Sequence, residues 1–536
     1  MQPTSNPASK SPVISGNLGV ESARGSIHLF AGAFSSTLIN GLGLIVIARL
    51  LGAKGYGIYT LSTLPSSVMI LLIDLGVNIA LTAYCARLKV RGDHESISTA
   101  FRTALTFNLA LSIVAFLTAL IFSRQLSEHL LARPELTPYV KICLATIILQ
   151  TAFSTLTALL LGMGKTQAIA SLQLAQALTK NILAVALILS GLEVLGAVIG
   201  YVAGYGFTVA LALTLKPVRA LLKPRGNDPH IFSLSKLKQM VAYGIPVYGA
   251  NILNNASQQY QRVILANYAS DAEVGGFSAV VNFSALVGVF TAPIATSLLP
   301  SFSKSRDTEE AGRLFRSSLK YLALIVLPIT MLIMLNSKDL IELIYGPGFS
   351  FSSTYLSLYS LTFLLYGLGA PIIPSLFNGL GYTRRTLEIA LTGLTVIIPS
   401  ALLLASAMKV PGLITAIILS QLASLTYGLW TARKHLQITF QPRSLFKIYL
   451  AALLSAVLVF LIPTPYPNHV ARIVLTSSAY LVAYAILAPV TGALKLKDLD
   501  DLAEVFNSTP LIKPLMNLVL NMERAIIVLV GRQSPD

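Results

Sequence analysis

Residues 100–122 read AFRTALTFNLALSIVAFLTALIF, an apolar run with a single charged residue. An α-helix rises 1.5 Å per residue, so about 20 such residues cross the roughly 30 Å hydrocarbon core of a bilayer. Similar runs recur along the whole chain, and we therefore predict an all-α, polytopic membrane protein with about 14 transmembrane helices. The predicted spans are 26–48, 58–84, 100–122, 139–161, 167–190, 192–215, 240–268, 275–300, 318–335, 355–379, 386–407, 411–431, 445–462 and 470–490.

The composition excludes most other classes of protein. Of 536 residues, 54% are hydrophobic and only 11% are charged, whereas soluble domains are about 25% charged. A soluble enzyme and a disordered chain are therefore excluded. An outer-membrane barrel is excluded as well, because its strands would show alternating segments of about 10 residues.

The sequence contains none of the patterns that would indicate a bound metal or cofactor. Its two cysteines, Cys85 and Cys143, have neither CxxC spacing nor a histidine cluster beside them. Gly164-Lys165-Thr166 resembles the end of a phosphate-binding loop, but the motif needs glycine where this chain has Leu159. We therefore expect no metal, no cofactor and no ATP-hydrolysing module, and we predict that the protein is not an enzyme.

The positive charge of the chain predicts its orientation. A net charge of +17 would suggest nucleic acid in a soluble protein, but in a membrane protein it reflects loops retained in the cytosol. With the N-terminus inside, 29 Lys and Arg fall in inner segments and eight in outer segments. We therefore predict a multi-pass protein of the cell membrane with both termini cytosolic and no nucleic-acid partner.

Three short matches indicate an internal repeat. They recur at spacings of 218, 217 and 216 residues, at equivalent places after the first, fourth and fifth spans of each half: 57–60 with 275–278, 162–166 with 379–383, and 194–196 with 410–412. A repeat of six helices preserves orientation, so the two lobes should be parallel, with a substrate site between them. Spans thirteen and fourteen form an extra helix pair.

The predicted division of the chain follows from this repeat. In order it comprises a disordered cytosolic tail (1–23), an N-terminal six-helix lobe (24–216), a basic cytosolic linker (217–239), a C-terminal six-helix lobe (240–432), transmembrane helices 13 and 14 (433–491), and a cytosolic tail with an interfacial helix (492–536).

The seventh span carries a polar stripe. Its members follow the spacing i, i+4, i+7, i+11 and so share one helical face: Asn251, Asn255, Gln258 and Arg262. Asn254, Gln259 and Gln261 broaden that face. Such a face cannot point to lipid, because unpaired amides are costly in hydrocarbon. It lines either a water-filled cavity or a polar contact between helices, whose bonds average about 0.6 kcal/mol each.

Further cations fall at several depths of the predicted bundle. In the fifth span, Gln173, Gln176 and Lys180 share one face, and a cation at that depth costs about 2.5–3.5 kcal/mol unless it is hydrated or paired. Arg24 and Arg49 bracket the first span, where both could simply anchor the topology. Together with Arg262 these side chains would suit a substrate that carries phosphate or pyrophosphate.

A carboxylate inside a span is a candidate for ion coupling. Asp74 lies in the second span with Asn78 one turn later, and intramembrane acids often mark ion pathways. The pair could bind H+ or Na+, or it could form a structural salt bridge or a helix cap.

Several motifs then resemble one family. They are IARLLGAKGYGIY at 47–59, DLGVN at 74–78, LGMGKT at 161–166, QRVIL at 261–265 and EVGGFS at 273–278. This set resembles the oligosaccharide flippases, or polysaccharide biosynthesis transporters, of the multidrug/oligosaccharidyl-lipid/polysaccharide exporter superfamily. The likeness covers roughly residues 25–435. The family often has Asp before the arginine of the fourth motif, where this chain has Gln261.

The resemblance implies a two-lobed bundle that works by alternating access. It would move lipid-linked oligosaccharide, a polyprenyl-phosphate or -diphosphate glycan, from the cytosolic to the outer leaflet for cell-surface polysaccharide assembly. Arg24, Lys180 and Arg262 would hold the diphosphate, and the amides of the seventh span the sugar. Membrane lipids, a glycan polymerase and glycosyltransferases are the implied partners.

Three alternatives remain at this stage. A peptidoglycan lipid-precursor flippase is closely related to the predicted function, and a cation-coupled multidrug exporter belongs to the same superfamily. A membrane glycosyltransferase or polymerase would need an acidic residue in a large loop, and the loops here are short and basic.

Overall fold

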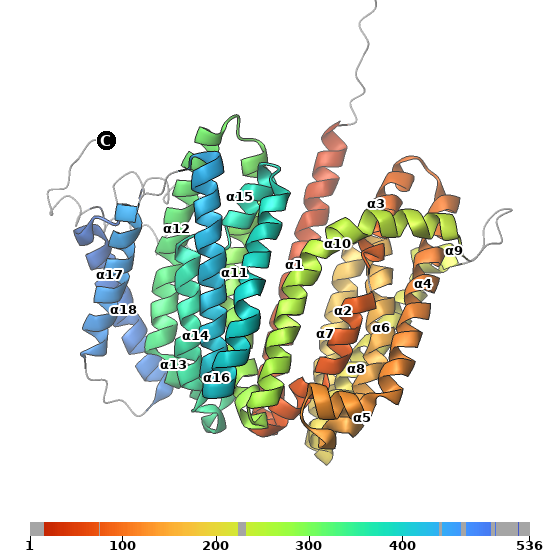
Figure 1. Ribbon diagram of the computed structural model, residues 1–536, viewed down its shortest axis with the longest axis horizontal. Helices are drawn as coiled ribbons and strands as arrows, with labels where there is room; N and C mark the ends of the chain where they lie inside the picture. The colour runs from red at the N-terminus through yellow and green to blue at the C-terminus, as the bar shows by residue number, and fades with distance from the viewer. Residues whose placement is uncertain are drawn as a thin grey trace, which may run out of the picture. The chain divides into compact units, whose positions relative to one another are not determined.

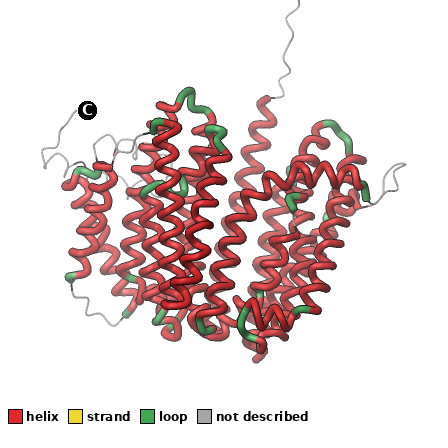
Figure 2. The backbone as a smooth tube through the Cα atoms, in the orientation of Figure 1, coloured by secondary structure: helices red, strands yellow, loops and turns green. Residues whose placement is uncertain are grey.

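The computed structural model describes the backbone of residues 15–73, 75–222, 232–438, 442–462 and 468–494, together with Leu499 and Arg524. Side chains are described from Phe34 onward, except at 246–247, 250–251, 285–286 and 289–296. Asp74, the side chains of Arg24 and Asn251, and nearly all of the predicted tail 492–536 lie outside the described residues. Within these ranges every regular element is a helix (Figure 2).

Most of the α-helices of the described residues are labelled in Figure 1. They are α1 (Ser15–Ser62), α2 (Leu64–Ile73), α3 (Val77–Val90), α4 (His94–Ile121), α5 (Ser123–Gln125), α6 (Thr137–Gly162), α7 (Thr166–Leu187), α8 (Glu193–Thr214), α9 (Lys216–Leu222), α10 (Leu234–Tyr268), α11 (Asp271–Ser303), α12 (Thr308–Leu335), α13 (Ser337–Tyr345), α14 (Ser352–Gly367), α15 (Ile373–Gly379), α16 (Thr383–Leu436), α17 (Pro442–Phe460) and α18 (His469–Thr491). Short π- and 3-10 turns join some of them: η1 (Leu126–Leu130), η2 (Pro134–Leu136), η3 (Ile188–Leu192) and η4 (Pro347–Phe349).

The described helices confirm an all-α membrane protein. Eight helical stretches are long and apolar enough to cross a bilayer. Two of them, Thr166–Thr214 and Thr383–Leu436, each take in two predicted spans. The number of crossings, about 14 from the sequence, therefore stays a prediction.

Two predicted spans are interrupted in the structure. The predicted span 58–84 is wrong as one helix, because α2 ends at Ile73 and α3 begins at Val77 after Gly76, whose φ is 78°. A Cβ on Gly76 would lie 2.4 Å from the carbonyl oxygen of Gly244, so only glycine permits this close approach. The tenth span likewise breaks between α14 and α15, where Gly369 has φ of 101°.

The chain divides into two compact units. The first takes in residues up to Leu50 together with Ser62–Ile252, and the second takes in Leu51–Leu61 and the chain from Leu253 onward. The division between the units falls within α1 and within α10. The predicted six-helix lobes and the linker at 217–239 stay predictions. Each unit is described below on its own.

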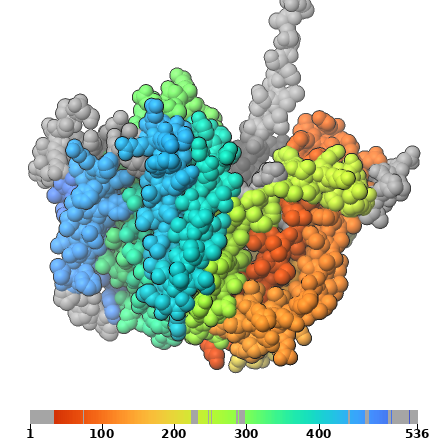
Figure 3. All heavy atoms as spheres, viewed as in Figure 1, coloured from red at the N-terminus to blue at the C-terminus, as the bar shows by residue number. Residues whose placement is uncertain are grey.

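In the first unit, the opening part of α10 packs across other helices (Figure 3). The Tyr248 hydroxyl donates a hydrogen bond to the carbonyl oxygen of Leu71. The Arg87 guanidinium lies 5.6 Å from the ring of Tyr84 and 5.4 Å from that of Tyr243. Cation–π contacts of this kind add to apolar burial, so this part of α10 is fixed to its unit.

In the second unit, residues 51–61 of α1 pack against α11. A Cβ on Gly57 would lie 1.8 Å from the carbonyl oxygen of Asp271, and one on Gly275 would lie 2.0 Å from that of Ala53. The amide of Asn282 donates to the Tyr56 hydroxyl at 2.6 Å. The first motif of the repeat and its counterpart therefore meet each other.

The backbone repeats as the sequence does. Glu193 and Lys409 occupy matching turns and share an unusual conformation, with φ/ψ of 44°/−126° and 53°/−124°. Gly164 and Gly381 match in the same way, with φ of 68° and 84°. Two equivalent turns with the same rare geometry support the internal repeat.

Candidate functional site

A polar pocket lies within the second unit. Its volume is about 590 Å³, within the range of roughly 300–1,000 Å³ typical of small-molecule sites. One wall is a face of α10, and the others come from α14, α15 and the two halves of α16. The residues that carry polar groups into it are Asn254, Ser257, Gln258, Gln261, Tyr366, Thr386, Ser420, Gln421 and Ser424.

Some polar side chains of this lining already form hydrogen bonds with the backbone, and at least one polar atom has no partner among the described residues. The Ser420 hydroxyl donates to the carbonyl of Gly393 at 2.8 Å, and Ser424 donates to that of Ile389 at 3.2 Å. The side-chain oxygen of Gln421 is buried and accepts no hydrogen bond from any described residue. A buried unpaired acceptor is costly, so a hydroxyl donor entering the pocket would find a ready partner.

The pocket is lined by one side of the predicted polar face of α10. Its α10 residues follow i, i+3, i+4, i+7 from Asn254. Of the predicted stripe itself only Gln258 is among them, together with Asn254 and Gln261 from the residues that broaden the stripe. Asn255 and Arg262 are exposed and are not part of the lining. The structure therefore separates Gln258 from its two neighbours in the stripe, while Asn251 lies outside the described side chains.

The break between α14 and α15 borders the same pocket. Pro371 and Pro374 line the pocket. The backbone between the end of α14 and the start of α15 turns at Gly369, just before these prolines. Proline cannot donate a backbone hydrogen bond inside a helix, so two prolines and a glycine explain why the predicted tenth span stops here.

In the first unit, Lys180 and Gln176 are buried on α7. Their exposed fractions are 7% and 9%, while Gln173 is half-buried. Gly204 of α8 lets the two helices approach, because a Cβ there would lie 2.7 Å from the Cβ of Lys180. The neighbouring Asn181 donates to the carbonyl of Ile39 at 3.1 Å. Lys180 forms no hydrogen bond or ion pair with any described residue.

Asn78 belongs to a buried network of amides and hydroxyls. Its amide donates to Ser154 at 3.1 Å, and its oxygen accepts from Asn108 at 3.1 Å. Asn108 also donates to Thr155 at 2.9 Å, and both are fully buried. This network joins α3, α4 and α6. Ion binding by Asp74 and Asn78 stays a prediction, and Arg49 is exposed on α1.

The sequence analysis missed a buried arginine. Arg102 is only 4% exposed, and all three guanidinium nitrogens lack a hydrogen-bond partner in the described part of the chain. It was counted among the inner-loop cations because it lies near the start of a predicted span. Its position within that apolar run was the available signal.

A second missed cluster joins α13 to α18. His469 Nδ1 lies 2.8 Å from Asp339 Oδ1, and its Nε2 lies 3.5 Å from Glu342 Oε2. Arg472 lies 3.4 Å from the same aspartate. These residues are far apart in sequence, so only the tertiary structure reveals the cluster. The described residues include no group of His, Cys, Asp or Glu arranged to hold a metal ion.

Comparison with known proteins shows which family this chain resembles. The sequence model of the polysaccharide biosynthesis protein family matches residues 46–354. The chain is 22% identical to stage V sporulation protein B of Bacillus subtilis over 317 residues, which are 54% of this chain and 59% of that protein. It is 22% identical over 353 residues to the lipopolysaccharide biosynthesis protein WzxC of Escherichia coli, 63% of this chain and 67% of that protein. The chain thus spans only about three fifths to two thirds of these relatives.

Solved structures share the fold over most of their length. One is the lipid II flippase MurJ in an inward closed conformation, with a TM-score of 0.69 and 13% identity over 86% of this chain and 99% of that chain. Another is an inward-facing multidrug resistance MATE family transporter of the MOP superfamily, with a TM-score of 0.61 and 16% identity over 75% of this chain and 94% of that chain. At these identities the likeness concerns the fold alone, and the proteins that share it are transporters rather than enzymes.

The family match covers more than half of the chain, and the fold agrees with it. The protein is therefore a multi-pass membrane protein that belongs to the polysaccharide biosynthesis protein family.

Proposed function

We propose that this protein is a flippase that moves a lipid-linked oligosaccharide from the cytosolic to the outer leaflet by alternating access. The polar headgroup would enter the bundle while the polyprenyl tail stays in the bilayer. Family membership and the fold shared with a lipid II flippase support transport of this kind. A membrane enzyme is less well supported, because the fold is that of transporters.

The observation that carries the proposal is the polar pocket against α10. Sugar hydroxyls donate hydrogen bonds, and the buried Gln421 oxygen is an acceptor that no described residue pairs with. Gln258 and Asn254 add amides to the same pocket. A cation-coupled multidrug exporter would favour acidic and aromatic side chains in such a lining, and α10 contributes only amides and a hydroxyl to it.

The phosphate groups of the substrate need cations. We assign this role to Lys180, Arg262 and Arg24, as the sequence predicts. Lys180 supports the assignment best, because the residue is only 7% exposed and its ammonium makes no bond to any described residue. A buried cation without a partner is costly, and a substrate phosphate would supply the missing partner.

A reconstituted flipping assay tests the proposal. The full chain is placed in vesicles that contain a polyprenyl-diphosphate oligosaccharide with a fluorescent label on the sugar. A reductant that cannot cross the membrane bleaches only the labelled lipid in the outer leaflet, so the loss of fluorescence measures the fraction that has been flipped. We expect the double variant Lys180→Gln and Arg262→Gln to slow flipping about tenfold or more. Thermal unfolding confirms that the variant stays folded.

A matched control removes two exposed cations elsewhere. Arg313→Gln with Lys338→Gln should flip at the wild-type rate. Full transport by the Lys180/Arg262 variant would refute the phosphate assignment. Absence of flipping by the wild-type protein with every polyprenyl-linked glycan tried would refute the function itself. Imposed H+ or Na+ gradients in the same vesicles would test whether transport is ion-coupled.

A further inference from the structure

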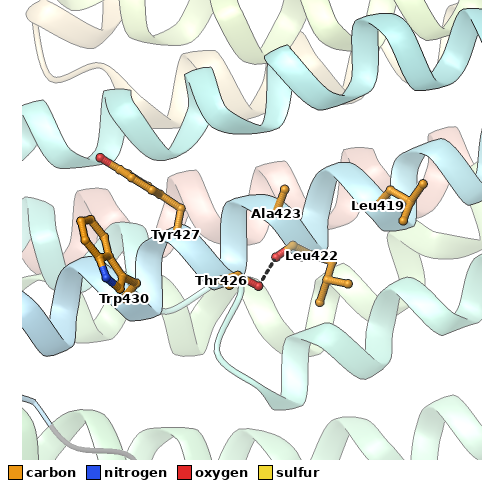
Figure 4. A pocket seen from close by; sticks show the side chains of 6 residues that line it. All are labelled: Leu419, Leu422, Ala423, Thr426, Tyr427 and Trp430. Carbon is orange, nitrogen blue, oxygen red and sulfur yellow. Dashed lines mark hydrogen bonds between the residues drawn. The ribbon is translucent and has the colours of Figure 1, made fainter.

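The second half of α16 carries a groove on the outside of the second unit, separate from the polar pocket. Its volume is about 510 Å³, and its lining is shown in Figure 4: Leu419, Leu422, Ala423, Thr426, Tyr427 and Trp430. Thr426 donates its hydroxyl to the carbonyl of Leu422 at 2.8 Å. Because this hydroxyl is satisfied within its own helix, the stretch from Leu419 to Thr426 presents an apolar surface.

The length of the groove matches one leaflet of a bilayer. Leu419 and Trp430 stand eleven residues apart on one helix, which corresponds to roughly 16 Å at 1.5 Å per residue. Half of a hydrocarbon core is about 15 Å thick. Trp430 and Tyr427 lie together at one end of the groove (Figure 4), with ring centroids 5.8 Å apart. Aromatic residues of this kind concentrate at membrane interfaces.

Cations gather at this aromatic end. The Lys434 ammonium lies 4.7 Å from the Trp430 ring centroid. The Tyr427 hydroxyl donates to Glu388 at 3.0 Å, and Glu388 in turn holds Arg385 at 2.6 Å and Arg384 at 3.5 Å. Two cations therefore pair with Glu388, and a third, Lys434, lies over the Trp430 ring. The charge count of the sequence predicts that this end of α16 faces the cytosol.

We propose that this groove is a binding site for an anionic phospholipid of the cytosolic leaflet. One acyl chain lies between Leu419 and Thr426, and the headgroup phosphate contacts Lys434 and Arg384, whose side chain is 90% exposed. The excess of positive charge selects an anionic headgroup over a zwitterionic one. The apolar length selects a lipid over a soluble anion.

The chain is well suited to a direct test, because Trp430 is its only tryptophan. Lipids with brominated acyl chains quench tryptophan on contact. The full-length protein is placed in nanodiscs of phosphatidylcholine that contain an equal minor fraction of brominated phosphatidylglycerol or brominated phosphatidylcholine. We expect the anionic lipid to be about fivefold enriched at Trp430 relative to the zwitterionic one.

Two variants locate the source of this enrichment. Lys434→Gln with Arg384→Gln should bring quenching by the two lipids to equality. Lys304→Gln with Arg313→Gln removes two exposed cations of the same predicted side and should keep the preference. Both pairs lie on the surface and remove the same charge, so general electrostatic attraction would affect them alike.

Four results would overturn the site. Equal quenching of the wild-type protein by both lipids would show no selectivity. A preference that persists in the Lys434/Arg384 variant, or that is lost equally in the control variant, would assign it to the overall charge. Loss of the preference on adding inorganic phosphate would identify the ligand as a soluble anion.

Discussion

Polar residues inside this bundle fall into two groups that differ in whether they have partners. Asn78, Asn108 and Thr155 are hydrogen-bonded to one another, although the Asn108 side-chain oxygen has no partner among the described residues. Arg102 and Lys180, by contrast, are buried without any partner among the described residues. Hydrogen bonds between membrane helices contribute only about 0.6 kcal/mol on average, but an unpaired buried charge costs several kcal/mol. The unpaired residues are therefore the informative ones.

Arg102 gives a prediction about stability. Arg102→Met keeps a long side chain and removes the unpaired charge, so we expect it to raise stability by about 1–4 kcal/mol. Thermal unfolding in detergent measures the change. Arg219→Met, at an exposed arginine of α9, should change the midpoint little. A lower midpoint for Arg102→Met would mean that the guanidinium is paired after all.

Asp93 gives a prediction about pH. It caps α4, accepting from the backbone amide of Ser96 at 2.9 Å, and this hydrogen bond lowers the pKa of Asp93. A lowered pKa in the folded state means that the stabilisation is present above the ordinary pKa, near 4, and is lost as the pH falls through the lowered value. Asp93→Ala should therefore cost about 1 kcal/mol at pH 7 and less in acid.

Hydrogen exchange of the first-turn amides of α4 would measure this effect. Asp93→Asn keeps the acceptor oxygen and should retain most of the protection without the pH dependence. Equal loss of protection in the Ala variant at pH 7 and in strong acid would contradict a role for the ionised carboxylate.

At the scale of elements, glycines decide how closely the helices approach. Gly57 of α1 and Gly275 of α11 bring two backbones together in the second unit, and Gly204 does the same for α7 and α8. Close backbone approach at small residues is a common means of association between membrane helices. These contacts depend on the absence of a single carbon atom.

Gly57→Ala tests this packing. The added methyl would lie 1.8 Å from the carbonyl of Asp271, so α1 and α11 must separate, and we expect a loss of about 1–3 kcal/mol or more. Gly41→Ala is the control in the same helix, because no atom lies within 4 Å of its Cβ. It should be neutral or slightly stabilising. Equal midpoints for the two variants in thermal unfolding would refute the contact.

At the scale of the whole molecule, the orientation predicted from charge can be measured. Cys85 and Cys143 are fully buried and should not react with reagents. We introduce Gly348→Cys in the predicted outer segment and Thr308→Cys in a predicted inner one, both at exposed positions. An impermeant maleimide should label intact cells only through Cys at 348. Labelling of the Thr308 variant instead would reverse the topology.

Membrane physics explains why so much of the fold was predictable. A helix in hydrocarbon must satisfy its own backbone hydrogen bonds, so apolar runs reveal helices directly, and the predicted spans fall on helices. The breaks at Gly76 and Gly369 were less visible, because each depends on a partner helix or on local proline chemistry. The polar character of α10 was predictable as well, since amides in a span are rare.

Which face of α10 lines the pocket could not be read from its sequence. Two overlapping stripes, one through Asn255 and Arg262 and one through Asn254 and Gln261, share Gln258 and differ by a rotation of the helix. The positions of α14 and α16 select the second stripe in this structure. For the same reason, the sequence alone gave no indication that Gln421 lines the pocket.

The sequence by itself determined the helical membrane fold, the repeat and the family, because these depend on local composition and on motifs that lie close together in the chain. Only the tertiary structure decided which polar side chains are satisfied and which are left open. The reason is that a hydrogen bond is made between residues that the sequence separates by up to hundreds of positions, as for Asn282 and Tyr56.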